Sequence, residues 1–240
     1  MTKRIITAVS GGFLALGLSA GLLAASPFTD AEAALRDVYG DYRVALFQSN
    51  AGNGDAVDSA LEAALSKWTA LEVDWTAAPP PQYAADPKFD ETLAQVRKTL
   101  KSAQAVAATG ALAEAHEELE GVRDAVWRMH SRNGIIGFSD RMNTYHAKME
   151  EVLSVAPDKV DEAALPDLLE QAAVLNYLAA DVAAHPAPEA GAPGYQQLVD
   201  GMTGSAAALL EAARAGDIEA VKTALSGLKP AYARLFAKYG

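Results

Sequence analysis

Methionine and histidine recur at helical spacing in the segment RMNTYHAKMEEVL, residues 141–153. In an α-helix, Met142, His146 and Met149 share one face with Leu153, because residues three or four positions apart are neighbours there. Thioether and imidazole groups are the ligand types that suit copper, above all Cu(I). Methionine is also a common filler of hydrophobic cores, where a single histidine can be held by a backbone or carboxylate partner. The pattern therefore predicts either a soft-metal site or a buried stripe that contains a histidine.

A second group of polar side chains comes before this segment, at steps of four, three, four and three along residues 111–132. Its members form one polar and aromatic stripe beside the apolar face of a helix: His116, Glu120, Arg123, Trp127 and His130. Such side chains are costly to bury without partners. His116 and Glu120, one turn apart, could chelate a divalent metal. The alternatives are an ordinary pair on a solvated helix edge and a buried polar network.

The linker SRNGIIGFS, residues 131–139, brings the two groups together if the helices on either side fold back on each other. His130 and Met142 then come to a similar height, and Trp127 faces His146. The candidate metal ligands are therefore His116, Glu120, His130, Met142, His146 and Met149. We expect an ion of copper or iron. Non-covalent haem b, held by histidine and methionine from facing helices, is the alternative cofactor.

Several kinds of chemistry are excluded or unsupported. The chain has no cysteine, which rules out disulfides, thiolate ligands, cysteine nucleophiles and covalently attached haem. It also lacks His-Glu-x-x-His, a nucleotide-binding glycine loop, Gly-x-Ser-x-Gly and the Glu-x-x-His pairs of di-iron bundles. We therefore do not expect an enzyme. Metal binding is the predicted function, with haem b electron transfer and a cofactor-free interaction module as alternatives.

The N-terminus has the pattern of a secretory signal peptide. Lys3 and Arg4 form a short basic region, and residues 5–25 are apolar and uncharged before small residues follow. We expect a signal peptide within residues 1–28, cleavage near Ala25, a periplasmic location and no membrane span in the mature chain. An uncleaved anchor is the alternative, because about 20 apolar residues can cross a bilayer.

The charge of the chain limits its partners. Acidic residues number 31 and basic residues 20, which gives a formal net charge of −11 without any run of lysine or arginine. Nucleic acid is therefore not an expected partner. The acidic excess favours solubility, or attraction for cations or a basic partner. The partner expected for an exported metal carrier is a membrane transporter or a redox protein.

Helical periodicity runs through nearly the whole chain, and alanine is abundant while strand-like alternation is absent. The helices are predicted at residues 29–50, 54–75, 88–108, 111–132, 140–154, 162–184, 194–215 and 217–238. Thr29 and Glu32 are expected to form a capping box at the first helix, Ser139 to cap the fifth, and Asp55 and Asp217 to cap the helices after two glycine turns.

Short turns between long helices predict the arrangement of the chain. Glycine-containing turns are expected at residues 51–54, 109–110 and 215–217, and the four prolines of residues 77–88 must form a non-helical connection. The fold class predicted is all-α, built from antiparallel helical hairpins. Two tandem four-helix bundles, residues 29–133 and 134–240, fit best, and one fused eight-helix array is the alternative.

The last segment, AAALLEAARAGDIEAVKTALSGLKPAYARLFAKYG, residues 206–240, resembles the closing hairpin of the cytochrome c′ family. Both have an alanine-rich helix, a Gly-Asp turn and a final helix. The family's final helix carries Cys-x-x-Cys-His, whereas residues 229–236 contain neither cysteine nor histidine. The resemblance implies an exported four-helix bundle without a covalent haem site, and no haem-binding residue is carried over.

Overall fold

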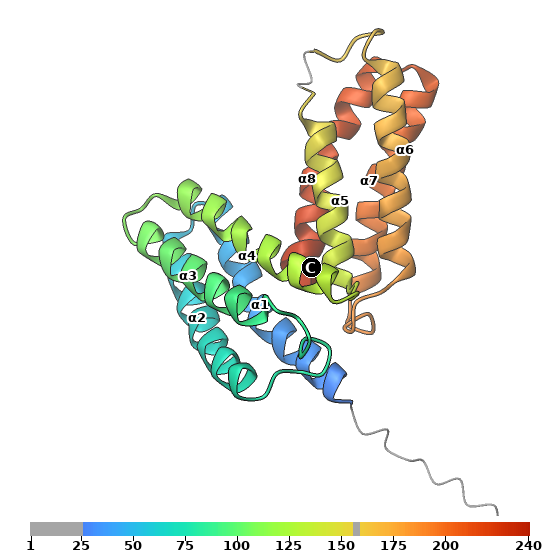
Figure 1. Ribbon diagram of the computed structural model, residues 1–240. Coiled ribbons are helices and arrows are strands. Elements are labelled where there is room, and N and C mark those ends of the chain that lie inside the picture. Colours follow the sequence, from blue (N-terminus) through green and yellow to red (C-terminus); the bar gives the residue numbers. More distant parts are fainter. Residues whose placement is uncertain (1–25, 156–158) are drawn as a thin grey trace, which may run out of the picture.

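The chain is all-α, as predicted. The computed structural model describes residues 26–155 and 159–240, and those residues form eight α-helices and no strand (Figure 1). The helices are α1 (Pro27–Asn50), α2 (Gly54–Ala77), α3 (Phe89–Ala107), α4 (Leu112–Arg132), α5 (Phe138–Leu153), α6 (Leu165–Ala184), α7 (Tyr195–Ala215) and α8 (Ile218–Tyr239). Within the described ranges, none of these helices has the length and apolar character needed to cross a membrane.

The first helix begins earlier than the sequence indicated. Ser26 is the N-cap of α1: the Thr29 amide donates to its hydroxyl at 3.2 Å, and the Ser26 amide donates to the Thr29 hydroxyl at 3.0 Å. The predicted capping box of Thr29 with Glu32 is therefore wrong. Helix α1 is capped one turn upstream, which leaves the carboxylate of Glu32 available for contacts outside its own helix.

The short turns lie where they were predicted. Gly110 and Gly216 have φ angles of 83° and 69°, the left-handed conformation that ends a helix and that favours glycine. Asp217 caps α8 by accepting from the Ala220 amide at 3.0 Å, as expected. The N-cap of α2 is Asn53 and not Asp55, because α2 already begins at residue 54.

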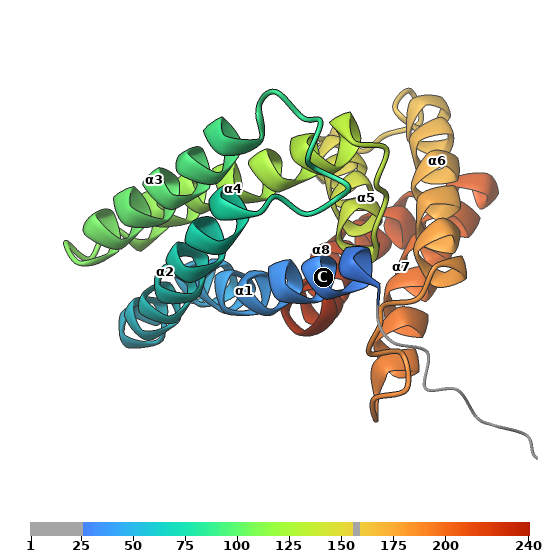
Figure 2. The same cartoon turned by 60° about the horizontal axis from the view of Figure 1, so that its bottom comes forward.

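The helices gather in two groups of four (Figures 1 and 2). In the first group, α1 packs against α2 and α4, and α3 packs against α2 and α4. In the second group, α6 packs against α5 and α7, and α8 packs against α5 and α7. Each group is thus a closed ring of four neighbouring helices, and the buried apolar residues of the two groups form one continuous cluster. The two groups meet where α1 contacts α8 and where α4 contacts α5.

The connection between α2 and α3 closes one end of the first group. Tyr83 of this connection is 1% exposed and stacks on Phe89, with ring centroids 5.3 Å apart. Asp86 accepts hydrogen bonds from Arg132 at 2.8 Å and from Asn133 at 3.1 Å. These contacts fix the last turn of α4 and the residues that follow it.

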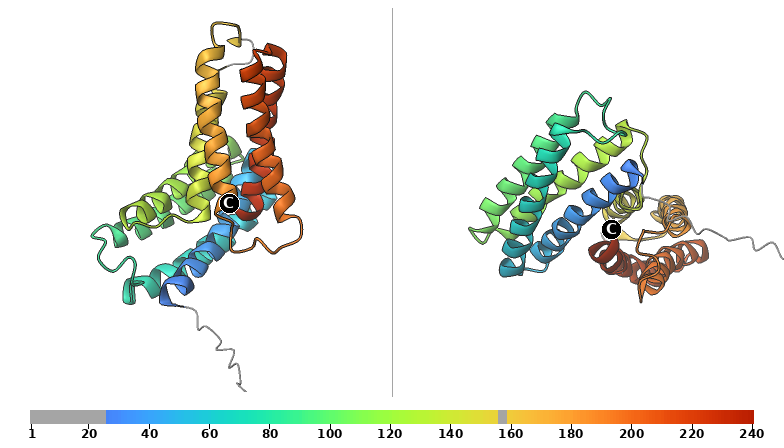
Figure 3. Two further views of the ribbon diagram at one scale, coloured as in Figure 1. Left: turned by 90° about the vertical axis from the view of Figure 1, so that its right-hand side faces the viewer. Right: turned by 90° about the horizontal axis from the view of Figure 1, so that it is seen from below.

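Helices α4 and α5 do not fold back on each other as a hairpin. Helix α4 lies in the first group, and α5 turns away from it to run along the second group (Figure 3). Helix α5 begins at Phe138 after Gly137, so the predicted cap at Ser139 is also wrong. The bend between the two helices forms one side of the junction between the two groups.

Candidate functional site

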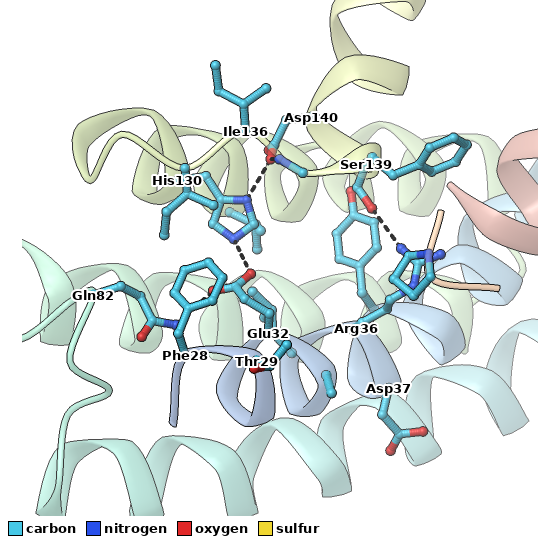
Figure 4. Close-up of a pocket in the computed structure, with 18 of the residues that line it drawn as sticks. Phe28, Thr29, Glu32, Arg36, Asp37, Gln82, His130, Ile136, Ser139 and Asp140 are labelled. Atoms are coloured by element: carbon cyan, nitrogen blue, oxygen red, sulfur yellow. Dashed lines mark hydrogen bonds and ion pairs between the residues drawn. The ribbon is translucent and has the colours of Figure 1, made fainter. Parts of the chain in front are cut away.

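A cavity of about 940 Å³ lies between the two groups of helices, and we call it the junction cavity. Its walls come from α1, the end of α4, the turn into α5, and the connection between α6 and α7 (Figure 4). Its apolar lining is formed by Phe28, Leu35, Val126, Ile135, Ile136 and Phe138. Charged side chains from both groups converge on the same space, and the junction cavity is large enough to enclose a small molecule.

His130 lies on the wall of the junction cavity, in the last turn of α4, with its side chain 8% exposed. Its Nδ1 is 2.8 Å from Oδ2 of Asp140, which belongs to the first turn of α5. The same carboxylate oxygen accepts from the Gly137 amide at 2.7 Å. Its Nε2 is 3.5 Å from Oε2 of Glu32 on α1 and has no hydrogen-bond partner in the part of the chain that the structure describes. The imidazole therefore links α1, α4 and α5 (Figure 4).

Glu32 is held from its other side. Its Oε1 accepts from the hydroxyl of Tyr83 at 2.7 Å and from Nε2 of Gln82 at 2.9 Å. The Tyr83 ring is also nearly parallel to that of His130, with centroids 6.3 Å apart. Burial, followed by the charge of Glu32, raises the pKa of Tyr83, so its hydroxyl stays protonated and donates to the carboxylate. Glu32 is thus positioned by Tyr83 and Gln82, and His130 by Asp140.

The carboxylates around His130 change its protonation. Burial alone would lower the pKa of His130, because a charged imidazole loses solvation. The hydrogen bond and charge of Asp140, with the charge of Glu32, outweigh this effect and raise the pKa above its usual value. The site therefore has a local negative potential that favours a proton, or another cation, at His130.

Two arginines complete the wall, and both have partners. Arg36 donates through Nε and Nη2 to the carboxylate of Glu189, at 2.7 and 2.6 Å, and through Nη2 to the Tyr239 carbonyl at 2.7 Å. Arg43 is 6% exposed and donates to the Gly240 carbonyl. Burial, with the nearby charge of Arg36, lowers the pKa of Arg43 to about 10. These contacts fasten α8 and the connection between α6 and α7 to α1.

The predicted metal-ligand face of α5, formed by Met142, His146 and Met149, is divided between the hydrophobic core and a second cavity. Met142 and Met149 are both fully buried, at 0% exposure, and neither lines the junction cavity or the second cavity described next. His146 points to that second cavity and not to the one that holds His130. The predicted set of His130 with the α5 face is therefore not brought together, because α5 turns away from α4 instead of pairing with it. Trp127, expected to face His146, is 43% exposed.

The second cavity, of about 490 Å³, lies between α1, α4, α5 and α8. It does bring together three of the predicted ligands, His116, Glu120 and His146. Nδ1 of His116 is 3.0 Å from the Leu46 carbonyl, and its Nε2 is 4.0 Å from Oε1 of Glu120. Nε2 of His146 is 3.4 Å from Oε1 of Glu150. Two imidazole–carboxylate pairs from neighbouring helices thus share one wall.

Basic residues occupy the same wall of the second cavity. Arg123 is 3.3 Å from Glu120, and Lys229 is 3.3 Å from Glu150. Burial, then the charge of Arg123, lowers the pKa of His146 to about 4, so the imidazole is neutral. The positive potential that disfavours a proton at His146 equally disfavours a metal cation.

No group of three or more histidine, aspartate or glutamate side chains is placed to hold a metal ion within residues 26–155 and 159–240. Among the imidazole–carboxylate pairs described above, His130 with Glu32 is the pair whose surrounding charges favour a cation. Sequence reasoning missed Glu32 and Asp140, because each looked like an ordinary residue of a helical first turn. The available signal for Asp140 was its place as an acidic residue three positions after Gly137, at the end of the glycine turn.

Comparison with protein-family models, curated protein sequences and solved structures finds no match to this chain.

Proposed function

We propose that this chain is an exported binding protein that holds a divalent ion of copper or iron between His130 and Glu32, on the wall of the junction cavity. The observation that carries the proposal is the placement of His130. Asp140 fixes its Nδ1 at 2.8 Å, while its Nε2 faces Oε2 of Glu32 at 3.5 Å without a hydrogen bond from the described residues.

The surroundings of both side chains resemble those of metal ligands. Histidines that bind metals usually donate their other ring N–H to a carboxylate, as His130 can to Asp140. Carboxylate ligands are usually hydrogen-bonded in turn, as Glu32 is to Tyr83 and Gln82. Two donor atoms in a tetrahedral metal site lie about 3.4 Å apart, given metal–ligand distances of about 2.1 Å. The 3.5 Å between Nε2 and Oε2 is compatible with that separation.

The donor types favour a divalent ion. One imidazole and one carboxylate suit Cu²⁺ or Fe²⁺, whereas Cu(I) would call for the thioethers of Met142 and Met149, which are buried in the second group. Two protein donors leave further coordination positions, and the junction cavity beside them can supply water or a small chelating molecule to those positions.

Export and the choice of partner rest on sequence alone. The signal peptide expected in residues 1–28 falls largely on residues 1–25, outside the described part of the chain. For an exported metal carrier, a membrane transporter or a redox protein remains the partner that we propose.

Haem b bound through His130 is the second candidate. The observation in its favour is the volume of the junction cavity together with its apolar lining, beside one imidazole that is already oriented by a carboxylate. Haem and a bare ion differ in the spectrum that they produce, since only haem gives an intense Soret absorption.

Calorimetric titration of the purified mature chain with Cu²⁺ and with Fe²⁺ under nitrogen tests the proposal. We expect one equivalent to bind to the wild type, and binding at least tenfold weaker in His130→Ala and Glu32→Gln. His185→Ala is the matched control, because His185 is an exposed histidine just after the end of α6 whose ring, among the described residues, contacts only Asp181. Equal affinity in His130→Ala, or no metal binding by the wild type, contradicts the proposal. A Soret band on addition of haemin that is lost in His130→Ala favours the second candidate.

A further inference from the structure

The second cavity contains an arginine that is short of partners. The side chain of Arg123 is 12% exposed and lines this cavity from α4. Among the described residues its one charged partner is Glu120, with Nη2 3.3 Å from Oε1, and no described group accepts a hydrogen bond from it. A guanidinium has five N–H donors in a planar fork that matches the two oxygens of a carboxylate. Most of the donor capacity of Arg123 is therefore unused.

Buried hydroxyl groups beside Arg123 are also without acceptors. Tyr232 lines the cavity from α8, and Tyr42 of α1 lies close enough to interact electrostatically with both Tyr232 and Arg123. Burial raises the pKa values of both phenols well above the usual range, so both remain O–H donors. Neither hydroxyl has a hydrogen-bond partner within the described residues. The same cavity also contains two buried acceptor atoms without a hydrogen-bond partner among the described residues, Oδ1 of Asn143 and Oε1 of Glu150. Buried polar groups are nearly always paired, so the unpartnered hydroxyls point to an acceptor that enters the cavity.

The carboxylates in the same wall do not neutralise this surplus. The side chains of Glu120 and Glu150 are 41% and 42% exposed and Glu117 is exposed as well, so water screens much of their charge, although Oε1 of Glu150 is buried. The side chain of Arg123 is only 12% exposed, so its charge is screened less than theirs. A second cation, Lys229, lies at the mouth of the cavity with its side chain 56% exposed. The buried part of the cavity therefore carries a positive potential although the rim is acidic.

Apolar and aromatic side chains form much of the remaining lining, beside the polar side chains of Asn50, His116 and Asn143. Phe47 of α1 and Phe236 of α8 line the cavity, and the ring of His146 stacks on that of Tyr232 with centroids 4.9 Å apart. The volume of about 490 Å³ is far larger than an inorganic ion needs. Such a lining suits the ring or short chain that carries a carboxylate better than it suits a fully hydrated anion.

We propose that the second cavity binds a small organic acid, with Arg123 forking onto its carboxylate and the aromatic side chains of α1 and α8 covering its apolar body. The hydroxyl of Tyr232 donates to the same carboxylate. Lys229 stands at the entrance, where its charge attracts the anion. This site is separate from the one proposed for a metal, since it shares neither His130 nor Glu32, and it stands whether or not a metal binds.

Chemical-shift titration of the full mature chain with sodium benzoate, at constant ionic strength and pH 7, tests the site. Benzamide is the matched ligand, because it keeps the ring and the planar group but carries no charge. We expect saturable shifts at backbone amides around Tyr232 and Phe236 with benzoate, and at least tenfold weaker binding of benzamide. Equal binding of the two ligands, or no saturable binding of benzoate, overturns the proposal.

Two arginine variants locate the interaction. Arg123→Gln should weaken benzoate binding at least tenfold. Arg128→Gln, five residues further along the same helix with its side chain 58% exposed, should leave it unchanged. Unchanged affinity in Arg123→Gln also overturns the proposal. If Arg123→Gln does not fold, Arg123→Lys keeps the charge but not the fork and should bind benzoate more weakly than the wild type. Unchanged affinity in that variant counts against the forked contact.

Discussion

Nε2 of His130 and Oε2 of Glu32 lie 3.5 Å apart, although the two residues belong to helices that are far apart in the sequence. Helices α1 and α4 are neighbours in the first group, and Asp140 adds the first turn of α5 from the second group. One imidazole therefore joins both groups of helices. Its neighbourhood should matter for stability as well as for any ligand in the junction cavity.

Asp140→Asn should lower the free energy of unfolding by about 1–3 kcal/mol. The variant removes the charge that supports His130 and weakens the contact with the Gly137 amide, while the side chain remains 5% exposed. Denaturant unfolding monitored by far-UV circular dichroism measures this loss. Asp124→Asn serves as the control, since the Asp124 side chain is 56% exposed and lies 4.0 Å from Arg128. This variant should change the free energy of unfolding by less than about 0.5 kcal/mol.

The pH dependence of stability should reveal the raised pKa of His130. The folded state binds the proton more tightly than the unfolded state, whose histidine pKa is about 6.5. The stabilisation is thus complete below about pH 6.5 and disappears as the pH rises through the folded pKa. Without metal, the gap in unfolding free energy between wild type and His130→Gln should be larger at pH 6 than at pH 9. A constant gap would show that His130 contributes by packing alone.

His146 should act in the opposite direction. Burial, with the charge of Arg123, lowers its pKa to about 4, so the unfolded state binds the proton more readily between about pH 6.5 and pH 4. Stability should fall across that window as the pH is lowered, by about 1–3 kcal/mol from this residue. His146→Gln should flatten the fall. An equally steep fall in the variant would assign it to other groups.

Metal affinity should rise with pH, because the ion and a proton compete for His130. The raised pKa of His130 means that the apoprotein carries this proton up to a higher pH than an ordinary histidine does. In titrations with Cu²⁺ between pH 6 and pH 8, the affinity should increase up to tenfold for each unit by which the pH is raised, as long as the pH is below that pKa. Binding should also release protons into the buffer. Binding that is independent of pH across this range would place the ion at another group.

The sequence was sufficient to predict the helices. Each turn carries a residue with a strong local preference, such as Gly110 and Gly216 at left-handed positions and Asp217 as a cap. The predicted helix ends agree with the observed ones to within three residues for all eight elements. Local rules of this kind act within one turn of helix, so they can be applied without knowledge of the rest of the fold.

The angle between α4 and α5 could not be predicted in the same way. The turn of residues 133–137 has the glycines of a hairpin, but the direction of α5 depends on packing against α6 and α8. Because α5 turns away from α4, His130 does not meet Met142 and Met149, although the predicted hairpin placed them together. Glu32 was misread for a related reason. Its position suggested a local cap, whereas its partners, Tyr83 and His130, are close only in the folded chain.

Tyr83→Phe should separate the positioning of Glu32 from simple packing. The ring of Tyr83 is 1% exposed and should keep its stacking on Phe89, while the loss of the hydroxyl leaves Gln82 as the remaining donor to Oε1 of Glu32. We expect a loss of about 1 kcal/mol in the free energy of unfolding, and a fall of about tenfold in metal affinity, because a less well held carboxylate is a poorer ligand. Tyr177→Phe is the control, since Tyr177 is 70% exposed on α6 and should change neither quantity. A loss of stability with unchanged metal affinity would show that the Tyr83 hydroxyl supports the fold alone, and that Glu32 needs no such support to act as a ligand.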